Sequence, residues 1–479
     1  MKVLFVTSES YPFIKTGGLG DVACSLPKAL KKLGADVRVV MPKYLQIVEF
    51  IKQQMEPLDE FTVPVGWRNQ YCGIERYVSE GVEYYFVDNE YYFKRENAYG
   101  YFDDAERFAF FSRAVIEFIK RRIFVPDVIH LNDWHTALVP AYLKSEDMEP
   151  VDVSALRTMF TIHNLQYQGR FAPEVFYDIT GLPHEMMSDE GLEFFGDVNF
   201  MKGAINYSDM VTTVSPSYAQ EIRMPYYGEN LDGLLRKREE VLHGILNGVD
   251  YELYDPKTDP ALFANYDENS LEKKAENKLK LQQMLGLPED KDIPIIGMVT
   301  RLVSQKGIDL VERVLGEVLA HKVQFVIIGT GDEKYHASMN YYGMTYPEKC
   351  AVRIQFDATL AQRIYAGADL FLMPSQFEPC GIGQLIALKY GTLPIVRETG
   401  GLRDTVIPYN QATGEGNGFS FTNYNAHDML HVIEYALSVY EDKGVWKNLM
   451  LQAMNRDFSW NKSAKEYLKR YRELMEMNK

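Results

Sequence analysis

The sequence opens on an apolar run, Val3-Leu4-Phe5-Val6-Thr7, and then reaches a glycine-rich segment, Lys15-Thr16-Gly17-Gly18-Leu19-Gly20-Asp21. The run is too short for a signal peptide, and its residue types predict a buried strand. Residues from Val22 to about Leu33 form an amphipathic helical segment, and Val37–Met41 is a second apolar run. Strand, glycine turn, helix and strand together predict a βαβ unit with a parallel sheet.

The same pattern continues along the chain in two series. The further strands expected in the first series are Asp127–Leu131, Thr158–Ile162 and Asp209–Val214. Those expected in the second are Ile293–Val299, Lys322–Ile328, Ala351–Phe356, Ala368–Met373 and Thr392–Val396. Continuous β-branched runs separated by helices are typical of sheets buried on both faces. We therefore predict an α/β fold with two doubly wound, Rossmann-like domains.

The boundary between the two series lies near Asn247-Gly248-Val249-Asp250, which we interpret as a hinge. We expect a first domain over residues 1–246 and a second over residues 247–457. A last amphipathic helix, at about residues 458–479, follows the completed second domain. Since its Tyr467, Leu468, Tyr471 and Leu474 share one side, we expect it to pack back on the first domain.

Composition restricts the class of protein. The 479 residues carry a formal net charge of −16, and a nucleic-acid-binding protein would need a basic face. No stretch approaches the roughly 20 apolar residues of a membrane span. Four scattered cysteines fit a reducing compartment, and none has zinc-site or CxxC spacing. We expect a cytoplasmic protein with no nucleic-acid partner, no membrane partner and no metal.

Ligands of open parallel sheets bind beyond the carboxyl ends of the strands, so the loops there carry the chemistry. In the first such loop Lys15 and Asp21 flank the glycines, including Gly18. A cation and a carboxylate on a glycine turn suit an anionic, hydroxyl-rich ligand. A tight strand-to-helix connection is the alternative interpretation of the glycines.

Two cations follow an expected strand of the second domain. Arg301 and Lys306 lie in one loop after Val299, and Glu378 follows Met373 in another loop. Fixed cations at such a position would neutralise a departing diphosphate. The alternatives are solvated surface charges and, for Glu378, a carboxylate that favours a helix N-terminus.

Several strings along the whole chain resemble the bacterial glycogen synthase and plant starch synthase family. They begin with the Lys15–Asp21 segment. The others are Tyr99-Gly100 with Asp104–Phe108, Asp133-Trp134-His135, His163-Asn164-Leu165-Gln166-Tyr167-Gln168-Gly169, Asn247–Asp250, Arg301–Gly307, Glu378-Pro379-Cys380-Gly381, Thr399–Leu402 and Phe458-Ser459-Trp460. The resemblance implies a retaining glucosyltransferase of the GT-B fold, with two Rossmann-like domains facing across a cleft.

The resemblance also implies the substrates and the mechanism. The donor would be ADP-glucose, with UDP-glucose as an alternative, and the acceptor an α-1,4-glucan such as glycogen or a maltooligosaccharide. Glucose would pass with front-face retention to the non-reducing end, the leaving phosphate helping to deprotonate the acceptor. Arg301 and Lys306 would stabilise the diphosphate, Lys15 would bind phosphate on domain closure, and Glu378 would contact the glucose. The backbone of Cys380, Gly381 and Gly383 would hold the diphosphate, without a cofactor or a metal.

The remaining site residues are also implied by the resemblance. His163 would lie near the transferred sugar, acting through its carbonyl or a hydrogen bond to a hydroxyl rather than as a general base. Asp133, Asn164 and Asn247 would bind substrate, as would Gly18 and Asp21 of the glycine turn. Phe356 would lie beside the nucleotide base, although a core phenylalanine is an equal alternative. We assign His135 to sugar contacts and His130 to the core.

Two departures from the wider pattern stand out. Many retaining GT-B enzymes carry a second glutamate where this chain has Ile386, and some synthases carry a threonine where it has Gly383. The tyrosines between Tyr84 and Tyr101 could stack on glucan rings or belong to the core. A different GT-B enzyme, such as a sucrose-type transferase or an epimerase, and a non-catalytic glucan-binding protein are the competing functions.

Overall fold

The computed structural model describes residues 1–145 and 148–477, and the chain divides into two compact units. Unit 1 comprises Met1–Asn247 and Trp460–Lys479, and unit 2 comprises Gly248–Ser459. The division falls one residue from the expected boundary, and the last two residues of the expected 458–479 segment lie outside the described residues. In the described part of the chain, no helix is long and apolar enough to cross a bilayer.

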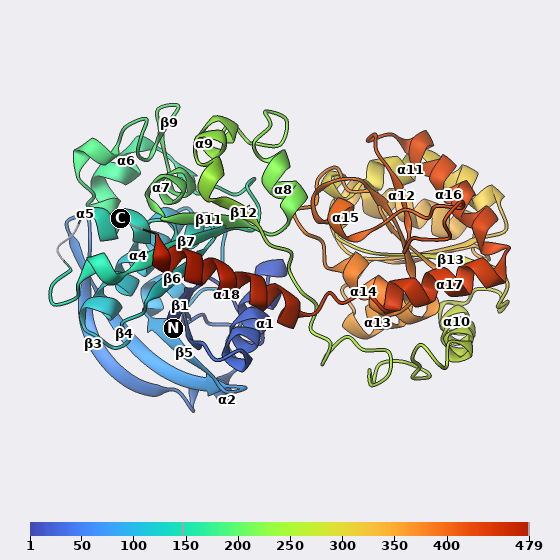
Figure 1. The fold of residues 1–479 in the computed structure, drawn as a ribbon, viewed down its shortest axis with the longest axis horizontal. Coiled ribbons are helices and arrows are strands. Elements are labelled where there is room, and N and C mark those ends of the chain that lie inside the picture. The colour runs from blue at the N-terminus through green and yellow to red at the C-terminus, as the bar shows by residue number, and fades with distance from the viewer. Residues whose placement is uncertain (146–147, 478–479) are drawn as a thin grey trace. The chain divides into compact units, whose positions relative to one another are not determined.

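Unit 1 is built on a nine-stranded sheet of order β12-β11-β7-β6-β1-β2-β5-β4-β3 (Figure 1). The strands are β1 Lys2–Val6, β2 Asp36–Pro42, β3 Glu56–Val65, β4 Arg68–Ser79, β5 Val82–Asp88, β6 Val128–Asn132, β7 Arg157–Ile162, β11 Met210–Thr213 and β12 Leu242–Gly244. Pairing is parallel from β12 to β5 and antiparallel between β5, β4 and β3. A parallel sheet was predicted, but its strands β5 and β12 were not. The antiparallel extension was not predicted.

The helices of unit 1 begin with α1, which spans Gly18–Lys32 and so starts four residues before the expected helix. Of the glycines in the quoted segment, Gly18 and Gly20 are therefore part of its first turn, and Gly17 is the residue that caps it. The other helices are α2 Glu49–Lys52, α3 Glu90–Phe93, α4 Asp104–Lys120, α5 Val139–Ser145, α6 Pro173–Val175, α7 Phe200–Tyr207, α8 Pro216–Glu221, α9 Asp232–Lys237 and α18 Trp460–Glu476. A small sheet of order β8-β10-β9 joins β8 Arg170–Phe171, β10 Asp197–Asn199 and β9 Glu193–Phe194.

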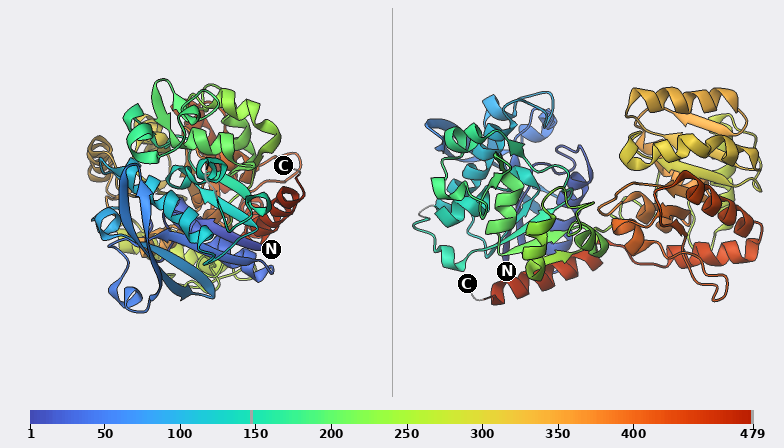
Figure 2. Two further views of the ribbon diagram at one scale, coloured as in Figure 1. Left: turned by 90° about the vertical axis from the view of Figure 1, so that its left-hand side faces the viewer. Right: turned by 90° about the horizontal axis from the view of Figure 1, so that it is seen from above.

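Helix α18 packs beside α1 in unit 1, so the chain ends in the unit where it began (Figures 1 and 2). Its Tyr467, Leu468, Tyr471 and Leu474 are buried in the unit 1 core. The Tyr471 hydroxyl lies 2.7 Å from Nδ1 of His130, whose Nε2 lies 2.7 Å from Oγ1 of Thr161. His130 is fully buried and belongs to the core, as predicted.

Unit 2 is a six-stranded parallel sheet of order β15-β14-β13-β16-β17-β18. The strands are β13 Ile295–Val299, β14 Gln324–Ile328, β15 Cys350–Arg353, β16 Leu370–Met373, β17 Leu393–Arg397 and β18 Phe419–Phe421. The helices are α10 Glu272–Leu285, α11 Ile308–Ala320, α12 Glu333–Thr345, α13 Ala358–Gly367, α14 Gly383–Lys389, α15 Gly400–Thr405, α16 Ala426–Tyr440 and α17 Lys443–Met454. Strand β15 ends three residues before the predicted end, which leaves Phe356 in a loop.

Candidate active site

In unit 1 the predicted residues gather at the carboxyl ends of three adjacent strands. Glu9 follows β1, Asp133 follows β6 and His163 follows β7, and β1, β6 and β7 are neighbours in the sheet. Because these strands are parallel, the loops after them leave the sheet at one edge. The sequence predicted Asp133 and His163 in this position, whereas it gave Glu9 no role.

Asp133 has a strained backbone and a buried environment. Its φ is 55°, a value that non-glycine residues seldom adopt. Its Oδ1 accepts a hydrogen bond of 2.8 Å from the backbone N–H of His163. Burial raises the pKa of Asp133 to about 7, although the N–H groups of His163 and Asn164 oppose the shift. The carboxyl group therefore exchanges its proton near neutral pH, and it ties the loop after β6 to the loop after β7.

His163 is held by Asn132, the last residue of β6. Its Nε2 lies 2.9 Å from Oδ1 of Asn132, whose amide nitrogen donates to the carbonyl of Val6 at 2.9 Å. That amide orientation makes Nε2 of His163 the donor and leaves Nδ1 as an acceptor. Burial lowers the pKa of His163 to about 3, so the ring is neutral at pH 7. A neutral ring suits a hydrogen bond to a sugar hydroxyl, which was the predicted role.

The glycine turn is anchored by the buried carboxylate of Glu9, which is 4% exposed. Its oxygens accept hydrogen bonds from the N–H of Thr16 at 2.6 Å, the Thr16 hydroxyl at 2.9 Å and the N–H of Gly17 at 3.3 Å. The hydroxyl of Tyr99 donates to the same carboxylate at 3.2 Å. Glu9 thus holds the glycine turn through these hydrogen bonds, and the adjacent Lys15 remains exposed.

Lys15 and Asp21 pair across the first turn of α1. Nζ of Lys15 lies 2.7 Å from Oδ1 of Asp21, and both side chains are more than a third exposed. Gly18, the first residue of α1, is also exposed. An exposed pair is held weakly, so the Lys15 ammonium can be drawn to an anion.

The aromatic residues around this edge belong mostly to the core. Tyr84, Tyr85 and Tyr92 are buried and belong to the core, which was the alternative to stacking on glucan rings, whereas Tyr99 is partly buried. Burial holds the pKa of His135 well below its usual range. Its ring stacks on Tyr99 at 4.4 Å between centroids, which argues against the predicted sugar contact through this ring.

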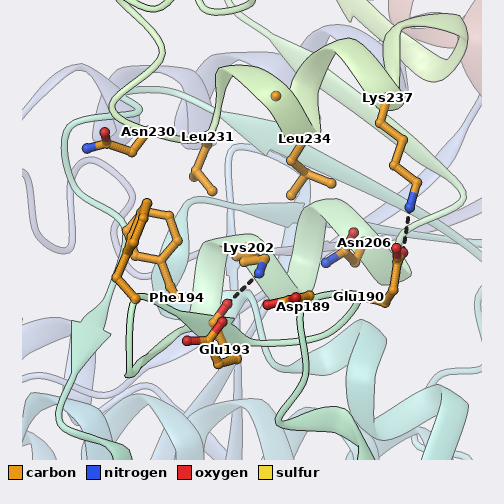
Figure 3. Close-up of a pocket in the computed structure, with 12 residues that line it drawn as sticks. Asp189, Glu190, Glu193, Phe194, Lys202, Asn206, Asn230, Leu231, Leu234 and Lys237 are labelled. Atoms are coloured by element: carbon orange, nitrogen blue, oxygen red, sulfur yellow. Dashed lines mark hydrogen bonds and ion pairs between the residues drawn. The ribbon is translucent and has the colours of Figure 1, made fainter.

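Unit 1 has two adjoining hollows, and the smaller of them borders the loop after β7. One, of about 420 Å³, is lined by Trp134, Gln166, Tyr167, Gln168 and Arg170, among others. The second, of about 520 Å³, shares Phe194 and Asn230 with the first. Figure 3 shows Lys202 pointing to the carbonyl of Glu193 and Lys237 pairing with Glu190 at its rim. Aromatic faces beside amides and carboxylates form a surface suited to a neutral polyhydroxyl chain.

In unit 2 the predicted carboxylate and one predicted cation form a direct pair. Nζ of Lys306 lies 2.6 Å from Oε2 of Glu378, and the Ser375 hydroxyl donates to the same oxygen at 2.9 Å. Glu378 is 6% exposed. Since an ammonium has three donors and Glu378 occupies one, Lys306 keeps donors for a ligand.

The two loops that carry this pair are joined through their backbones. The N–H of Gln376 donates to the carbonyl of Gln305 at 2.8 Å. Gly307 has φ +73°, and a Cβ at this position would lie 2.2 Å from the carbonyl oxygen of Pro374. Only glycine permits this approach, so the glycine after Lys306 sets the distance between Lys306 and Glu378.

The segment after Glu378 packs closely on the loop that begins α15. A Cβ on Gly400 would lie 2.0 Å from the carbonyl oxygen of Glu378, and one on Gly401 would lie 2.0 Å from that of Cys380. Cys380 is buried, whereas Gly381 and Gly383 are partly exposed. Gly381 precedes α14, and Gly383 is its first residue. This places the backbone of Gly381 and Gly383 at the same edge as Lys306.

Arg301, Phe356 and Asn247 lie in different surroundings. Arg301 follows β13 and is exposed, and within the described residues no hydrogen bond or ion pair holds its guanidinium. Phe356 is 89% exposed, so the alternative of a core phenylalanine is wrong. Asn247 ends unit 1 and is buried, and its Oδ1 has no hydrogen-bond partner among the described residues. Asn164, by contrast, accepts the N–H of Gln166 at 3.0 Å.

In residues 1–145 and 148–477 no three His, Cys, Asp or Glu side chains lie together as metal ligands would. The expectation that catalysis needs no metal stays a prediction.

Comparison with known proteins settles the family. The starch synthase catalytic domain matches residues 2–237, and the group 1 glycosyl transferases match residues 280–448. The chain is 55% identical over 478 residues to a glycogen synthase from Clostridioides difficile, covering 99% of this chain and 100% of the relative. The chain belongs to the glycogen synthase family. A second family member, from Caldicellulosiruptor saccharolyticus, is 55% identical over 476 residues, with the same two coverages.

Solved structures agree with the family and with the fold. The catalytic domain of starch synthase IV from Arabidopsis thaliana, bound to ADP and acarbose, matches with a TM-score of 0.91 and 33% identity over 99% of both chains. Sucrose-phosphate synthase from Thermosynechococcus elongatus matches at 0.59 and 18% identity over 99% of this chain and 98% of its own, and shows the fold alone. The resemblance to glycogen synthases and the two-domain GT-B class are confirmed, and the protein is a glycosyltransferase.

Sequence reasoning missed three supporting residues of the glycogen synthase site: Glu9, Asn132 and Ser375. Each holds a predicted element through hydrogen bonds and has no signature of its own. The only available signal was position, because all three lie at the carboxyl end of a strand or just beyond it.

Proposed function

We propose that this glycogen synthase transfers glucose from ADP-glucose to the 4-hydroxyl at the non-reducing end of an α-1,4-glucan, with retention of configuration. The observation that carries the proposal is the Lys306–Glu378 pair, 2.6 Å apart, in loops at the same edge of the sheet as the exposed Arg301. Cations aimed at a departing diphosphate stabilise the charge that develops on it. A carboxylate beside them suits the hydroxyls of the donor glucose.

The donor is assigned to the unit 2 group. In the proposed reaction the bond from the anomeric carbon to the diphosphate oxygen breaks, and a bond to the acceptor O4 forms on the same face. The acceptor proton passes to the leaving phosphate. Arg301 and Lys306 hold that phosphate, with backbone from Cys380, Gly381 and Gly383, and Lys15 adds a further cation. The exposed ring of Phe356 is proposed to stack on the adenine.

The acceptor is assigned to the unit 1 group. Neutral His163 accepts a hydroxyl hydrogen bond at Nδ1, and Asp133, Asn164 and Asn247 supply further polar contacts. The hollows beside the loop after β7 give a glucan chain aromatic and amide surface. The starch synthase IV structure bound to ADP and acarbose supports both the nucleotide and the glucan.

The compartment and the cofactor requirement complete the proposal. All four cysteines are free thiols, a state typical of the cytoplasm, where we place the enzyme. Arg301, Lys306 and Lys15 would supply the positive charge that a divalent metal supplies in other transferases, so we propose catalysis without a metal.

The test is incorporation of labelled glucose into glycogen from ADP-, UDP- and GDP-glucose, supplied separately at equal concentrations. We expect incorporation from ADP-glucose at least tenfold faster than from the others. β-Amylase, which cuts only α-1,4 bonds, should release the label as maltose. No incorporation from any donor, despite glucan binding, would leave only a non-catalytic glucan-binding protein.

A matched pair of lysine variants assigns the chemistry to the proposed site. Lys306→Ala should lower kcat by two orders of magnitude or more, because removal of one preorganised charge contact commonly costs that much. Lys322→Ala, which removes an exposed lysine of the same unit, should leave kcat unchanged. Both variants should keep the circular dichroism of the parent. Near-normal turnover in Lys306→Ala would remove Lys306 from the mechanism.

A further inference from the structure

A cavity in unit 2, of about 410 Å³, has no part in the proposed transfer reaction. Lys291 and Asp292, which line it, precede β13, and Asp369 directly precedes β16. Arg301 and Glu378 follow those same two strands. The cavity therefore lies at the amino-terminal edge of the parallel sheet, and the proposed donor site lies at the opposite edge.

Lysines dominate the charge of this cavity. The charged lining residues are Glu272, Lys274, Lys278, Lys291, Asp292, Asp369, Lys443 and Lys447. Five lysines against three carboxylates give a formal net charge of +2, in a chain whose formal net charge is −16. Salt screens exposed charges beyond about 8–10 Å, so a small anion would respond to these lysines rather than to the distant acids.

Two of the lysines, Lys274 and Lys278, are buried, and Asp369 pairs with only one of them. Lys278 pairs with Oδ2 of Asp369 at 2.8 Å, and that oxygen also accepts the N–H of Ile295 at 2.8 Å. Lys274 donates to the carbonyl of Ala366 and the hydroxyl of Thr392, both at 2.7 Å, and has no ion pair among the described residues. Burial, with the Lys278 cation nearby, lowers the pKa of Lys274 to about 7. The positive charge of Lys274 and Lys278 is therefore not balanced by the one carboxylate beside them.

The other lysines have donors to spare. Lys291, Lys443 and Lys447 are exposed, and in the described residues no hydrogen bond or ion pair holds their ammonium groups. Lys443 instead lies 3.2 Å from the ring centroid of Tyr440. Lys443 and Lys447 are four residues apart on α17, so they share one helix face.

The cavity also has apolar walls. Leu271, Tyr440 and Trp446 line it and are otherwise buried in the core clusters of unit 2. A volume of this size is in the range of small-molecule sites and exceeds what one inorganic phosphate needs. Ammonium groups at the rim and aromatic surface on the wall suit a ligand in which a phosphate group is attached to an organic group.

We propose that this cavity binds a small phosphomonoester, such as a sugar phosphate, with its phosphate on Lys443 and Lys447. The site is independent of the transfer reaction. Ligand binding there would join α10, the segment before β13 and α17, and would supply the missing negative charge near Lys274 and Lys278.

The experiment is equilibrium dialysis of the full chain with radiolabelled glucose 1-phosphate, inorganic phosphate and glucose. It uses the Lys306→Ala background, which weakens binding at the proposed catalytic site. Lys443→Gln/Lys447→Gln is compared with Lys465→Gln/Lys469→Gln. The control removes two exposed lysines of the same spacing from α18. Glucose transfer measured in the otherwise unchanged enzyme should be the same in both double variants.

We expect glucose 1-phosphate to bind at one site per chain, and Lys443→Gln/Lys447→Gln to weaken it at least tenfold while the control does not. Uncharged glucose should not occupy this site. Equal binding by the two double variants, or no binding by either, would overturn the proposal. Inorganic phosphate that binds as tightly as glucose 1-phosphate would overturn the assignment to a phosphomonoester.

Discussion

The glycine turn of unit 1 should depend on Glu9, a residue that touches no predicted ligand. Its carboxylate accepts two backbone N–H groups and the Thr16 hydroxyl, all within 3.3 Å, and the Tyr99 hydroxyl at 3.2 Å. Glu9→Ala removes all four contacts at once. The turn then loses the group that fixes its distance from β1, so the backbone that carries Lys15 is no longer held in place.

The magnitude follows from the groups left unpaired. A buried N–H without a partner costs about 1–3 kcal/mol. Thr16 and Gly17 are exposed residues, so water can replace part of the loss. We therefore expect Glu9→Ala to lower the free energy of unfolding by about 2 kcal/mol. The effect on kcat/KM for the donor should be larger, roughly 10- to 100-fold, because a displacement of about 1 Å in a positioning loop costs that much.

The assay combines initial rates over a range of ADP-glucose concentrations with thermal unfolding followed by circular dichroism. Glu9→Gln keeps the shape of the side chain, and the hydroxyls of Thr16 and Tyr99 can rotate to accept from its amide. It should therefore recover most of the activity. Glu49→Ala, at an exposed glutamate of the same unit, is the control. If Glu9→Ala loses stability but keeps kcat/KM within twofold, the carboxylate supports only the fold.

Three further predictions concern other parts of the molecule. Burial raises the pKa of Asp133 from an ordinary value of 3.8 to about 7, so its stabilising contribution is complete below about pH 4 and is lost as the pH rises to 7. Asp133→Asn should therefore flatten the fall in unfolding free energy over that window, measured by denaturant titration at each pH, and an unchanged slope would exclude this group. Tyr471→Phe removes the hydroxyl beside fully buried His130, so it should lower the free energy of unfolding by about 1–3 kcal/mol in the same titration at pH 7. An unchanged free energy of unfolding would mean that this hydrogen bond does not stabilise the packing of α18. Glucose transfer should continue at full rate after dialysis against EDTA, and a loss restored by a divalent cation would contradict catalysis without a metal.

The parallel part of the fold could be predicted because buried strands carry their own signal. Val3–Thr7 and the later apolar runs were recognised from residue type, and their bounds lie within two residues of those of a strand, except that β15 ends three residues early. Strands β3 and β4 were missed because they are half exposed. In β3 the polar residues Glu56, Asp59 and Glu60 interrupt the apolar pattern. Such strands are formed by pairing with β4 and β5, which no local run of residues reveals.

The site residues also divide into those that the sequence indicates and those that only the structure reveals. Asp133, His163 and Glu378 were predicted because they follow strands and belong to recognisable strings. The role of Asn132 depends on the register of β6 against β7, where it lies opposite Thr161, next to the loop that carries His163. The role of Glu9 depends on a turn that returns to it seven residues later. Contacts of this kind are set by tertiary structure, so their residues carry no separate mark in the sequence.

The charges of the two site groups support the division of substrates between them. In unit 1, Lys15 pairs with Asp21, and the carboxylate of Glu9 holds the same turn through Thr16. Asp133, which is about half ionised at neutral pH, interacts electrostatically with Glu9. This group carries no excess of positive charge, so Lys15 alone is a poor site for a diphosphate. In unit 2, Arg301 and Lys306 outnumber Glu378, which leaves one positive charge. An anionic donor should therefore be captured by the unit 2 group. The neutral glucan suits the unit 1 group, which offers hydrogen bonds without a strong net charge.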